Sequence, residues 1–192
     1  MSPRCGVPDN DDYSKLHITK HYSFLNGRPT WHGSTVPLML NYALSEEHTI
    51  DYINNISDVL ERAFSKWSSV IPVNFTETQD YKHANIKIGF YYGDHGDESP
   101  FDDMVLAHAT GPGSGAFIHF NAGIIWAVDF NSEKSKSAFD LETTAIHEMG
   151  HVLGLDHSSN EESVMWPYTT PRKLWTMSMV FKFSTAHSKI QT

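Results

Sequence analysis

The stretch from His147 to His157 constrains this chain more than any other. It has the pattern His-Glu-x-x-His-x-x-Gly-x-x-His, in which Glu148 follows the first histidine and Gly154 precedes the last. Residues four apart share a face of a helix, so His147 and His151 can present two imidazoles to one metal ion. A glycine allows the backbone to turn sharply after the helix and to return His157 as a third ligand. Three nitrogen ligands and one open position are typical of a catalytic zinc ion.

The carboxylate of Glu148 lies beside these ligands, where it can act on a zinc-bound water. Zinc lowers the pKa of its water toward about 7 and polarises a peptide carbonyl. Glu148 then takes the proton of the water and passes it to the departing amine. The pattern therefore predicts peptide hydrolysis without a covalent intermediate.

The only cysteine of the chain, Cys5, stands in the segment Pro3-Arg4-Cys5-Gly6-Val7-Pro8-Asp9. One cysteine excludes an internal disulfide, and taken alone it indicates a free thiol in a disordered terminus. A thiolate is also a strong zinc ligand and could fill the open fourth position. A methionine, Met165, lies eight residues beyond His157 in Ser163-Val164-Met165-Trp166-Pro167. Its thioether could form an apolar floor beneath the imidazoles, although alone it reads as a core methionine.

These motifs together resemble the matrixins, the matrix metalloproteinase family of the metzincin clan. The resemblance runs from Pro3 to about Lys173, and residues 22–31 look most like the plant branch. It implies that Cys5 keeps a zymogen latent and that Arg4 pairs with Asp9. It also implies a methionine turn at Met165, a specificity pocket bordered by Pro167 and Tyr168, polypeptide substrates, and an extracellular or cell-surface location.

A second group of metal ligands is expected upstream. Three imidazoles and one carboxylate can close a tetrahedral zinc shell with no position left for water. Their sequence contexts resemble the structural zinc ligands of the family, although scattered histidines are more often solvated. The group consists of His95, Asp97, His108 and His119.

Calcium is where this chain departs from the family pattern. The loop after Asp102 carries Asp103-Met104-Val105 in place of glycines, and Asn121 and Ile124 stand where the pattern has carboxylates. Loss of charged oxygens weakens a site for a hard cation. Asp102 remains a candidate calcium ligand, in a domain that calcium stabilises less than it stabilises the relatives.

Composition sets the class of protein. A chain of 192 residues fits one domain, and its net charge of −9 does not favour nucleic-acid binding. No window reaches the length of a membrane span, and a monomer is expected. Strands are predicted at 36–43, 73–78, 85–91, 106–110 and 116–120, and helices at 49–68 and 140–152.

The predicted architecture is an α+β domain, with a long packing helix and a helix that carries the zinc site. By resemblance its sheet is twisted, mostly parallel and five-stranded. Residues 1–25 are predicted to be a residual propeptide, 26–173 the catalytic domain and 174–192 an atypical tail. Met1 has no apolar run ahead of the cysteine motif, so no signal peptide is evident and most of a prodomain is expected to be missing. The tail fits a frameshift relative to the last helix of the family, which would be lost or altered.

Two asparagines lie in glycosylation sequons, Asn55-Ile56-Ser57 and Asn74-Phe75-Thr76, which matter only if the chain enters the secretory pathway. Two other functions stay open. With both ends altered, the chain could be a catalytically inactive relic. It could also be a metal-binding interaction module that uses zinc structurally.

Overall fold

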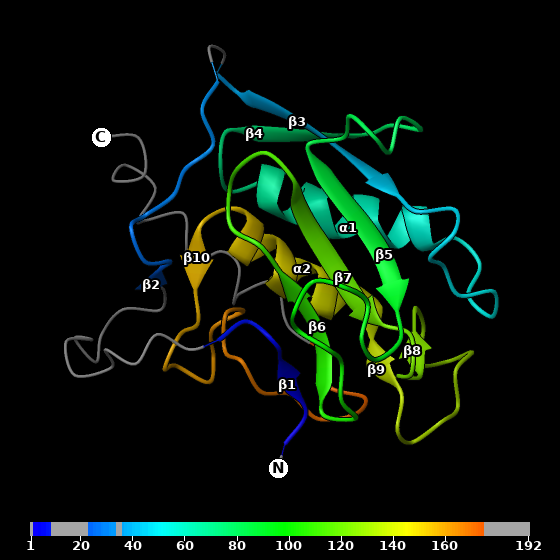
Figure 1. The fold of residues 1–192 in the computed structure, drawn as a ribbon. Coiled ribbons are helices and arrows are strands. Elements are labelled where there is room, and N and C mark those ends of the chain that lie inside the picture. Colours follow the sequence, from blue (N-terminus) through cyan, green and yellow to red (C-terminus); the bar gives the residue numbers. More distant parts are fainter. Residues whose placement is uncertain (1, 9–22, 34–35, 175–192) are drawn as a thin grey trace.

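A mixed sheet with both long helices on one of its faces forms the body of the protein (Figure 1). The computed structural model describes residues 2–8, 23–33 and 36–174. The strands of the main sheet lie in the order β1-β6-β7-β5-β3-β4. Their bounds are β1 (Arg4–Cys5), β3 (Leu38–Leu44), β4 (Val73–Glu77), β5 (Ile86–Tyr91), β6 (Val105–Ala109) and β7 (Ala116–Asn121).

Four of the five strand pairs in this sheet are parallel, and only β6 and β7 run antiparallel. The prediction of an α+β fold with a mostly parallel sheet is confirmed. The five strands β3 to β7 account for the predicted sheet, and β1 adds a sixth from the cysteine motif. Strand β6 packs against the helix at 141–152, which carries predicted zinc ligands. The outer edge of β6 is paired with β1.

The helices α1 (Ile56–Ser68) and α2 (Leu141–Val152) pack against each other beneath the sheet. The indole nitrogen Nε1 of Trp67 donates a hydrogen bond to the carbonyl of Ile146 at 2.9 Å and joins the two helices. The buried face of α1 follows the predicted helical period and consists of Ile56, Val59, Leu60, Ala63, Phe64 and Trp67.

The long helix is shorter than its apolar pattern predicts, because it begins at Ile56 and not at Thr49. Asn55 has φ 63, a left-handed conformation that a right-handed helix cannot continue through. Ile50 is buried in spite of this, from a segment before the helix. The other predicted elements agree with the observed bounds to within two residues.

Two short strand pairs lie outside the main sheet in the described part of the chain. β8 (Trp126–Ala127) pairs with β9 (Phe139–Asp140), and β10 (Leu155–Asp156) pairs with β2 (Ser23–Phe24). The glycine-rich segment 111–115 leads directly into β7, so no helix follows it. Within the described ranges, no helix is both long and apolar enough to span a bilayer. Asp9 and residues 175–192 lie outside the described residues, and the expectations for them stay predictions.

Candidate metal centre

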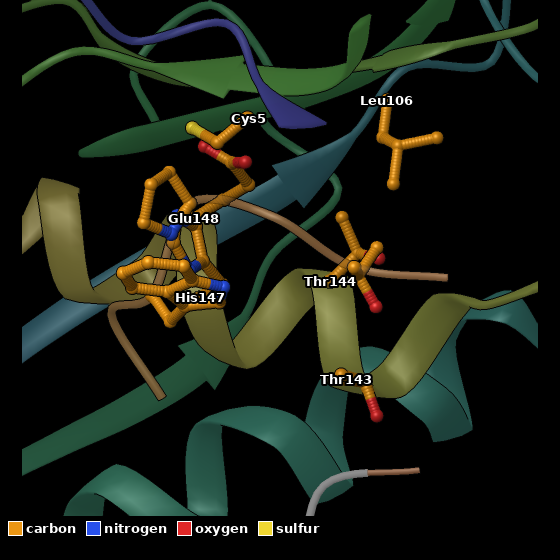
Figure 2. A pocket seen from close by; sticks show the side chains of 9 residues that line it. Cys5, Leu106, Thr143, Thr144, His147 and Glu148 are labelled. Carbon is orange, nitrogen blue, oxygen red and sulfur yellow. The ribbon is translucent and has the colours of Figure 1, made fainter. Parts of the chain in front are cut away.

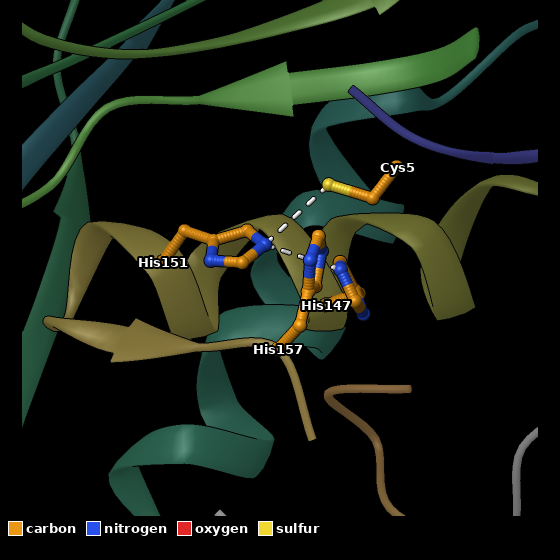
Figure 3. Close-up of side chains that lie close together, drawn as sticks. All are labelled: Cys5, His147, His151 and His157. Atoms are coloured by element: carbon orange, nitrogen blue, oxygen red, sulfur yellow. Dashed lines mark hydrogen bonds between the residues drawn. The ribbon is translucent and has the colours of Figure 1, made fainter. Parts of the chain in front are cut away.

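Helix α2 carries the first metal-ligand group. Asp140 caps the helix, since its side chain accepts a hydrogen bond from the backbone N–H of Thr143 at 2.7 Å, as predicted. Figure 3 shows the rings of His147 and His151 converging from the same face of this helix. Their Nε2 atoms lie 3.2 Å apart. The helical spacing therefore places two imidazole nitrogens where one ion could join them.

A glycine turn returns the third histidine. Gly154 has φ +97, and a Cβ atom at this position would lie 2.6 Å from the backbone oxygen of Pro29. Only glycine fits both the backbone conformation and the space. The chain then enters β10 and brings His157 to the other two rings, with ring centroids 5.4 Å from His147 and 4.8 Å from His151.

Two backbone carbonyls fix the orientation of the helical histidines. The Nδ1 atom of His147 lies 2.7 Å from the oxygen of Val164, and the Nδ1 atom of His151 lies 2.8 Å from the oxygen of Leu155. A carbonyl only accepts, so each Nδ1 carries the proton and each Nε2 presents its lone pair to the centre. These two carbonyls are functional groups that the histidine pattern alone does not reveal.

Burial keeps the imidazoles in the form that binds metal. It lowers the pKa of His147 to about 3 and the pKa of His151 well below its usual value, and neighbouring histidines add to both shifts. Glu148 is fully buried, and burial raises the pKa of its carboxyl group to about 8, while the Cys5 thiol partly offsets this. Near neutral pH His147 and His151 are thus neutral rings beside one carboxyl group whose charge is disfavoured.

Cys5 completes this group from the opposite end of the chain. Its Sγ atom lies 3.4 Å from Nε2 of His151, and its side chain is buried. The ligand atoms of Cys5, His147, His151 and His157 all lie within 4.8 Å of one another. One soft thiol and three imidazoles are a donor set that suits zinc.

The arm that carries Cys5 lies between β6 and the segment after the methionine turn. The backbone N–H of Cys5 donates to the oxygen of Pro167 at 2.9 Å, and that of Gly6 donates to the oxygen of Ala107 at 2.8 Å. A Cβ atom on Gly6 would lie 2.7 Å from a methyl carbon of Val105. The close approach of the arm to β6 therefore depends on this glycine.

Met165 packs directly against the zinc helix. It is fully buried, and a Cβ atom on Gly150 would lie 2.2 Å from its sulfur. Gly150 was not singled out by the sequence reasoning. Its signal was present, since a glycine inside a helix costs about 1 kcal/mol relative to alanine and usually has a packing reason.

A pocket opens beside Glu148 (Figure 2). The side chains of Cys5 and Glu148 point toward each other at this pocket. Pro167 borders it as expected, whereas Tyr168 is not among its lining residues and instead forms an isolated bridge with Arg4. Cys5, Leu106, Thr143, Thr144, His147, Glu148, Trp166, Pro167 and Thr169 line the pocket.

The second predicted group also comes together. His95 and Asp97 come from the loop between β5 and β6, while His108 and His119 are cross-strand partners on β6 and β7. The Oδ2 atom of Asp97 lies 2.9 Å from His95, 2.7 Å from His108 and 2.9 Å from His119. The four ligand atoms lie within 4.8 Å of one another.

Aromatic rings enclose this second group. Phe101 stacks on His95 and His108, with centroids 4.8 and 4.7 Å apart. Burial lowers the pKa of His119 to about 4. Burial alone would raise the pKa of Asp97, but hydrogen bonds from the Ser99 backbone and the histidines outweigh it and lower that pKa to about 2. The lowered pKa values of His108 and His119, an ionised carboxylate and an apolar enclosure fit a closed, structural zinc site.

Asp102 lies apart from both groups. Its Oδ1 atom accepts hydrogen bonds from the backbone N–H groups of Met104 and Val105, at 2.8 and 2.9 Å. The Nδ2 group of Asn121 donates to the backbone oxygens of Asp102 and Val105, at 3.0 and 2.8 Å. An amide donor thus occupies carbonyl oxygens that a calcium ion would need. These contacts do not favour calcium here, and a ligand role for Asp102 stays a prediction.

Comparison with known proteins agrees with this geometry. The family model described as Matrixin matches residues 30–182, and the chain belongs to the matrixin family. It is 50% identical over 178 residues to "Metalloendoproteinase 4-MMP" of Arabidopsis thaliana, covering 90% of this chain and 52% of that protein. It is 48% identical over 180 residues to "Metalloendoproteinase 1-MMP" of the same plant, covering 88% and 48%.

An animal relative is more distant. "Matrilysin" of Rattus norvegicus is 37% identical over 172 residues, covering 87% of this chain and 57% of that protein. The higher identity to the Arabidopsis proteins supports the plant branch. The chain spans about half the length of these two Arabidopsis relatives.

Proposed function

We propose that this chain is the catalytic part of a zinc-dependent metalloendopeptidase that Cys5 holds latent. The observation that carries the proposal is the convergence of Cys5, His147, His151 and His157 within 4.8 Å. Three of these groups belong to the folded body, and the fourth sits on an arm that, among the described residues, pairs with β6, with Met104 just before it and with the segment 167–169. Removal of the arm would take the Cys5 thiol away and leave the fourth ligand position beside the three histidines open.

Glu148 acts as the general base. Zinc held by the three imidazoles would supply a Lewis acid that activates water and polarises the peptide carbonyl. Glu148 accepts the proton from the attacking water on its carboxylate and then donates it to the leaving amine nitrogen.

Substrates are extended polypeptides. The arm shows how a chain can lie in the cleft, because the backbone N–H of Arg4 donates to the oxygen of Met104 at 2.9 Å and the arm adds a strand to β6. Once the arm leaves, the edge of β6 is available for a substrate backbone. A side chain next to the cleaved bond then reaches the pocket between Leu106, Thr143 and Pro167.

The second group serves as a structural zinc site. Its ligands join the loop between β5 and β6 to the strands β6 and β7, next to the cleft. An extracellular or cell-surface location is consistent with the family. Calcium, by contrast, contributes little to the loop that Asn121 holds.

A peptide-hydrolysis assay on zinc-loaded protein tests the proposal. Wild-type protein should be silent until a thiol-directed reagent is added, and Cys5→Ser should be active without it, since an alcohol is a poor zinc ligand. The same reagent should not activate Cys5→Ser further, because Cys5 is the only cysteine.

Other outcomes point to the alternatives. Zinc bound without hydrolysis in either protein would favour an inactive relic or an interaction module. Equal activity of untreated wild type and Cys5→Ser would remove the latency role of Cys5.

A further inference from the structure

Two sequons lie on elements that take no part in either metal group. Asn55-Ile56-Ser57 spans the start of α1, and Asn74-Phe75-Thr76 lies within β4. Both asparagines are exposed, and neither middle residue is proline. The two segments are near each other in the fold, because the hydroxyl of Ser57 donates to Oε1 of Glu77 at the end of β4, at 2.8 Å.

The side chain of Asn74 points away from the core. Side chains alternate along a strand, so Asn74 and Thr76 share the face opposite Val73 and Phe75. Val73 is buried, and the ring of Phe75 packs against Phe64 with centroids 5.4 Å apart. Asn74 and Thr76 are both exposed. The acceptor amide and the hydroxyl of this sequon therefore face solvent together.

An exposed apolar side chain lies beside Asn74. Met39 on β3 is the register partner of Asn74 on β4, and 54% of Met39 is exposed. Paired residues of adjacent strands project from the same face of a sheet. β4 is also the last strand on its side of the sheet. An uncovered outer strand is a template for pairing with other chains.

Asn55 is available for a different reason. It occupies the position before α1, where asparagine side chains usually cap the helix, but it makes no side-chain capping bond. Its left-handed backbone is a conformation that asparagine tolerates better than most residues. The amide is thus exposed and is not used to stabilise the helix.

We propose that Asn55 and Asn74 each carry an N-linked glycan, and that the glycan on Asn74 covers Met39 and the outer edge of β4. The amide nitrogen attacks the anomeric carbon of a lipid-linked oligosaccharide. A C–N bond forms, the bond to the lipid diphosphate breaks, and the nitrogen loses one proton. The proposal rests on the proposed function only in requiring entry into the secretory pathway. In the strand order, β4 lies at the opposite end of the sheet from β6 and its cleft, so the glycan on Asn74 leaves the site open.

Secretion of the full chain behind a heterologous leader from mammalian cells provides the test. Peptide N-glycosidase F should lower the mass of the secreted protein by two glycans. Asn55→Gln and Asn74→Gln should each remove one glycan. Thr76→Ser retains the sequon and should retain the glycan, whereas the isosteric Thr76→Val should lose it. Secreted wild type whose mass the enzyme does not change would overturn the proposal.

The covering of Met39 has its own readout. Peroxide should oxidise Met39 several-fold more slowly in the glycosylated protein than in Asn74→Gln, as measured by peptide mass mapping. The fully buried Met149 and Met165 serve as internal references. Equal rates for Met39 would overturn the covering. Peptide hydrolysis after thiol-directed activation, measured on samples without peroxide, should not differ between wild type and Asn74→Gln. A glycosylated and activated protein that lacks hydrolysis would count against the proposed function alone.

Discussion

The carboxyl group of Glu148 is buried among neutral imidazoles and near one thiol. An isolated buried charge is costly, and this cost is what raises the pKa of Glu148 to about 8. A divalent cation held by the three rings would reverse the preference, because a nearby positive charge favours the carboxylate. Glu148 can therefore act as a base only when a cation is bound by His147, His151 and His157.

Replacement of Glu148 by alanine should separate catalysis from metal binding. Peptide hydrolysis by the activated protein should fall by about 10²–10⁴-fold, the usual effect of a positioned base. Zinc content by elemental analysis should be unchanged, because Glu148 is not a ligand. Glu142→Gln is the matched control on the same helix, where Glu142 pairs with Arg62 at 2.8 Å. Near-normal activity in Glu148→Ala would disprove the assignment.

At the scale of elements, the turn after α2 decides where the third ligand goes. Gly154→Ala should be destabilising for two reasons, the left-handed φ and the contact with the backbone of Pro29. Gly27→Ala isolates the first reason, since Gly27 has φ +77 with nothing within 4 Å of a Cβ atom. We expect a loss of about 1–2 kcal/mol in unfolding free energy for Gly27→Ala and a clearly larger loss for Gly154→Ala.

Denaturant unfolding and zinc titration measure both variants. Gly154→Ala should also bind zinc more weakly, because His157 follows the displaced turn, whereas Gly27→Ala should bind it normally. Equal effects of the two substitutions on stability would show that the contact with Pro29 has no consequence.

The amide of Asn121 holds the loop before β6 by donating to the backbone oxygens of Asp102 and Val105, and we expect calcium to contribute little there. Asn121→Asp keeps the acceptor for the N–H of Gly123 but loses the donor to Asp102 and Val105. Without calcium we expect a loss of about 1–3 kcal/mol, since carbonyls then face a carboxylate. Added calcium should raise the melting temperature of Asn121→Asp and should barely change that of wild type.

Asn121→Ala is the control for this prediction. It loses the two donor bonds to Asp102 and Val105 and also the acceptor for the N–H of Gly123, without adding a negative charge, so calcium should not restore it. A calcium-induced shift in the wild type as large as in a typical matrixin would contradict the interpretation of this loop.

The spacing of apolar residues predicted which helices and strands exist better than it predicted where each one begins and ends. It extended α1 back through Ile50 and Ile53, because both fall on the helical period. The left-handed backbone of Asn55 breaks the helix, and no apolar pattern reports backbone conformation. The sequence did not predict strand β1. This strand has only two residues, too few for an apolar pattern, and it pairs with β6 across about half the chain.

At the scale of the whole molecule, the two metal-ligand groups differ in how many of their ligands the sequence alone could predict. The spacing of His147, His151 and His157 is local, so helix geometry and one glycine predict the trio. Cys5 and the group around Asp97 are assembled by the sheet from distant segments. Only resemblance to the family connected them before the structure brought their ligand atoms within 4.8 Å.

The burial of histidines in the two metal-ligand groups should make the metal-free protein sensitive to mild acid. Burial holds the pKa of His147 at about 3 and of His119 at about 4, while an unfolded histidine titrates near about 6.5. The unfolded state therefore binds more protons below about pH 6.5, and unfolding free energy falls as the pH falls. At pH 5 the loss is up to about 2 kcal/mol for a fully buried histidine. Asp97, with its lowered pKa, adds a loss only below about pH 4.

Glu148 opposes this trend and provides the means to test it. Its pKa is raised to about 8, so the folded state holds its proton more tightly and gains stability as the pH falls from about 8 toward about 4.5. Glu148→Gln removes that gain, and urea unfolding of metal-free Glu148→Gln should show a steeper loss between pH 7 and pH 5 than wild type. Glu148 and the histidines that oppose its effect lie in one buried cluster. If the unfolding free energy of both wild type and Glu148→Gln does not change with pH, these imidazoles are not held neutral inside the folded protein.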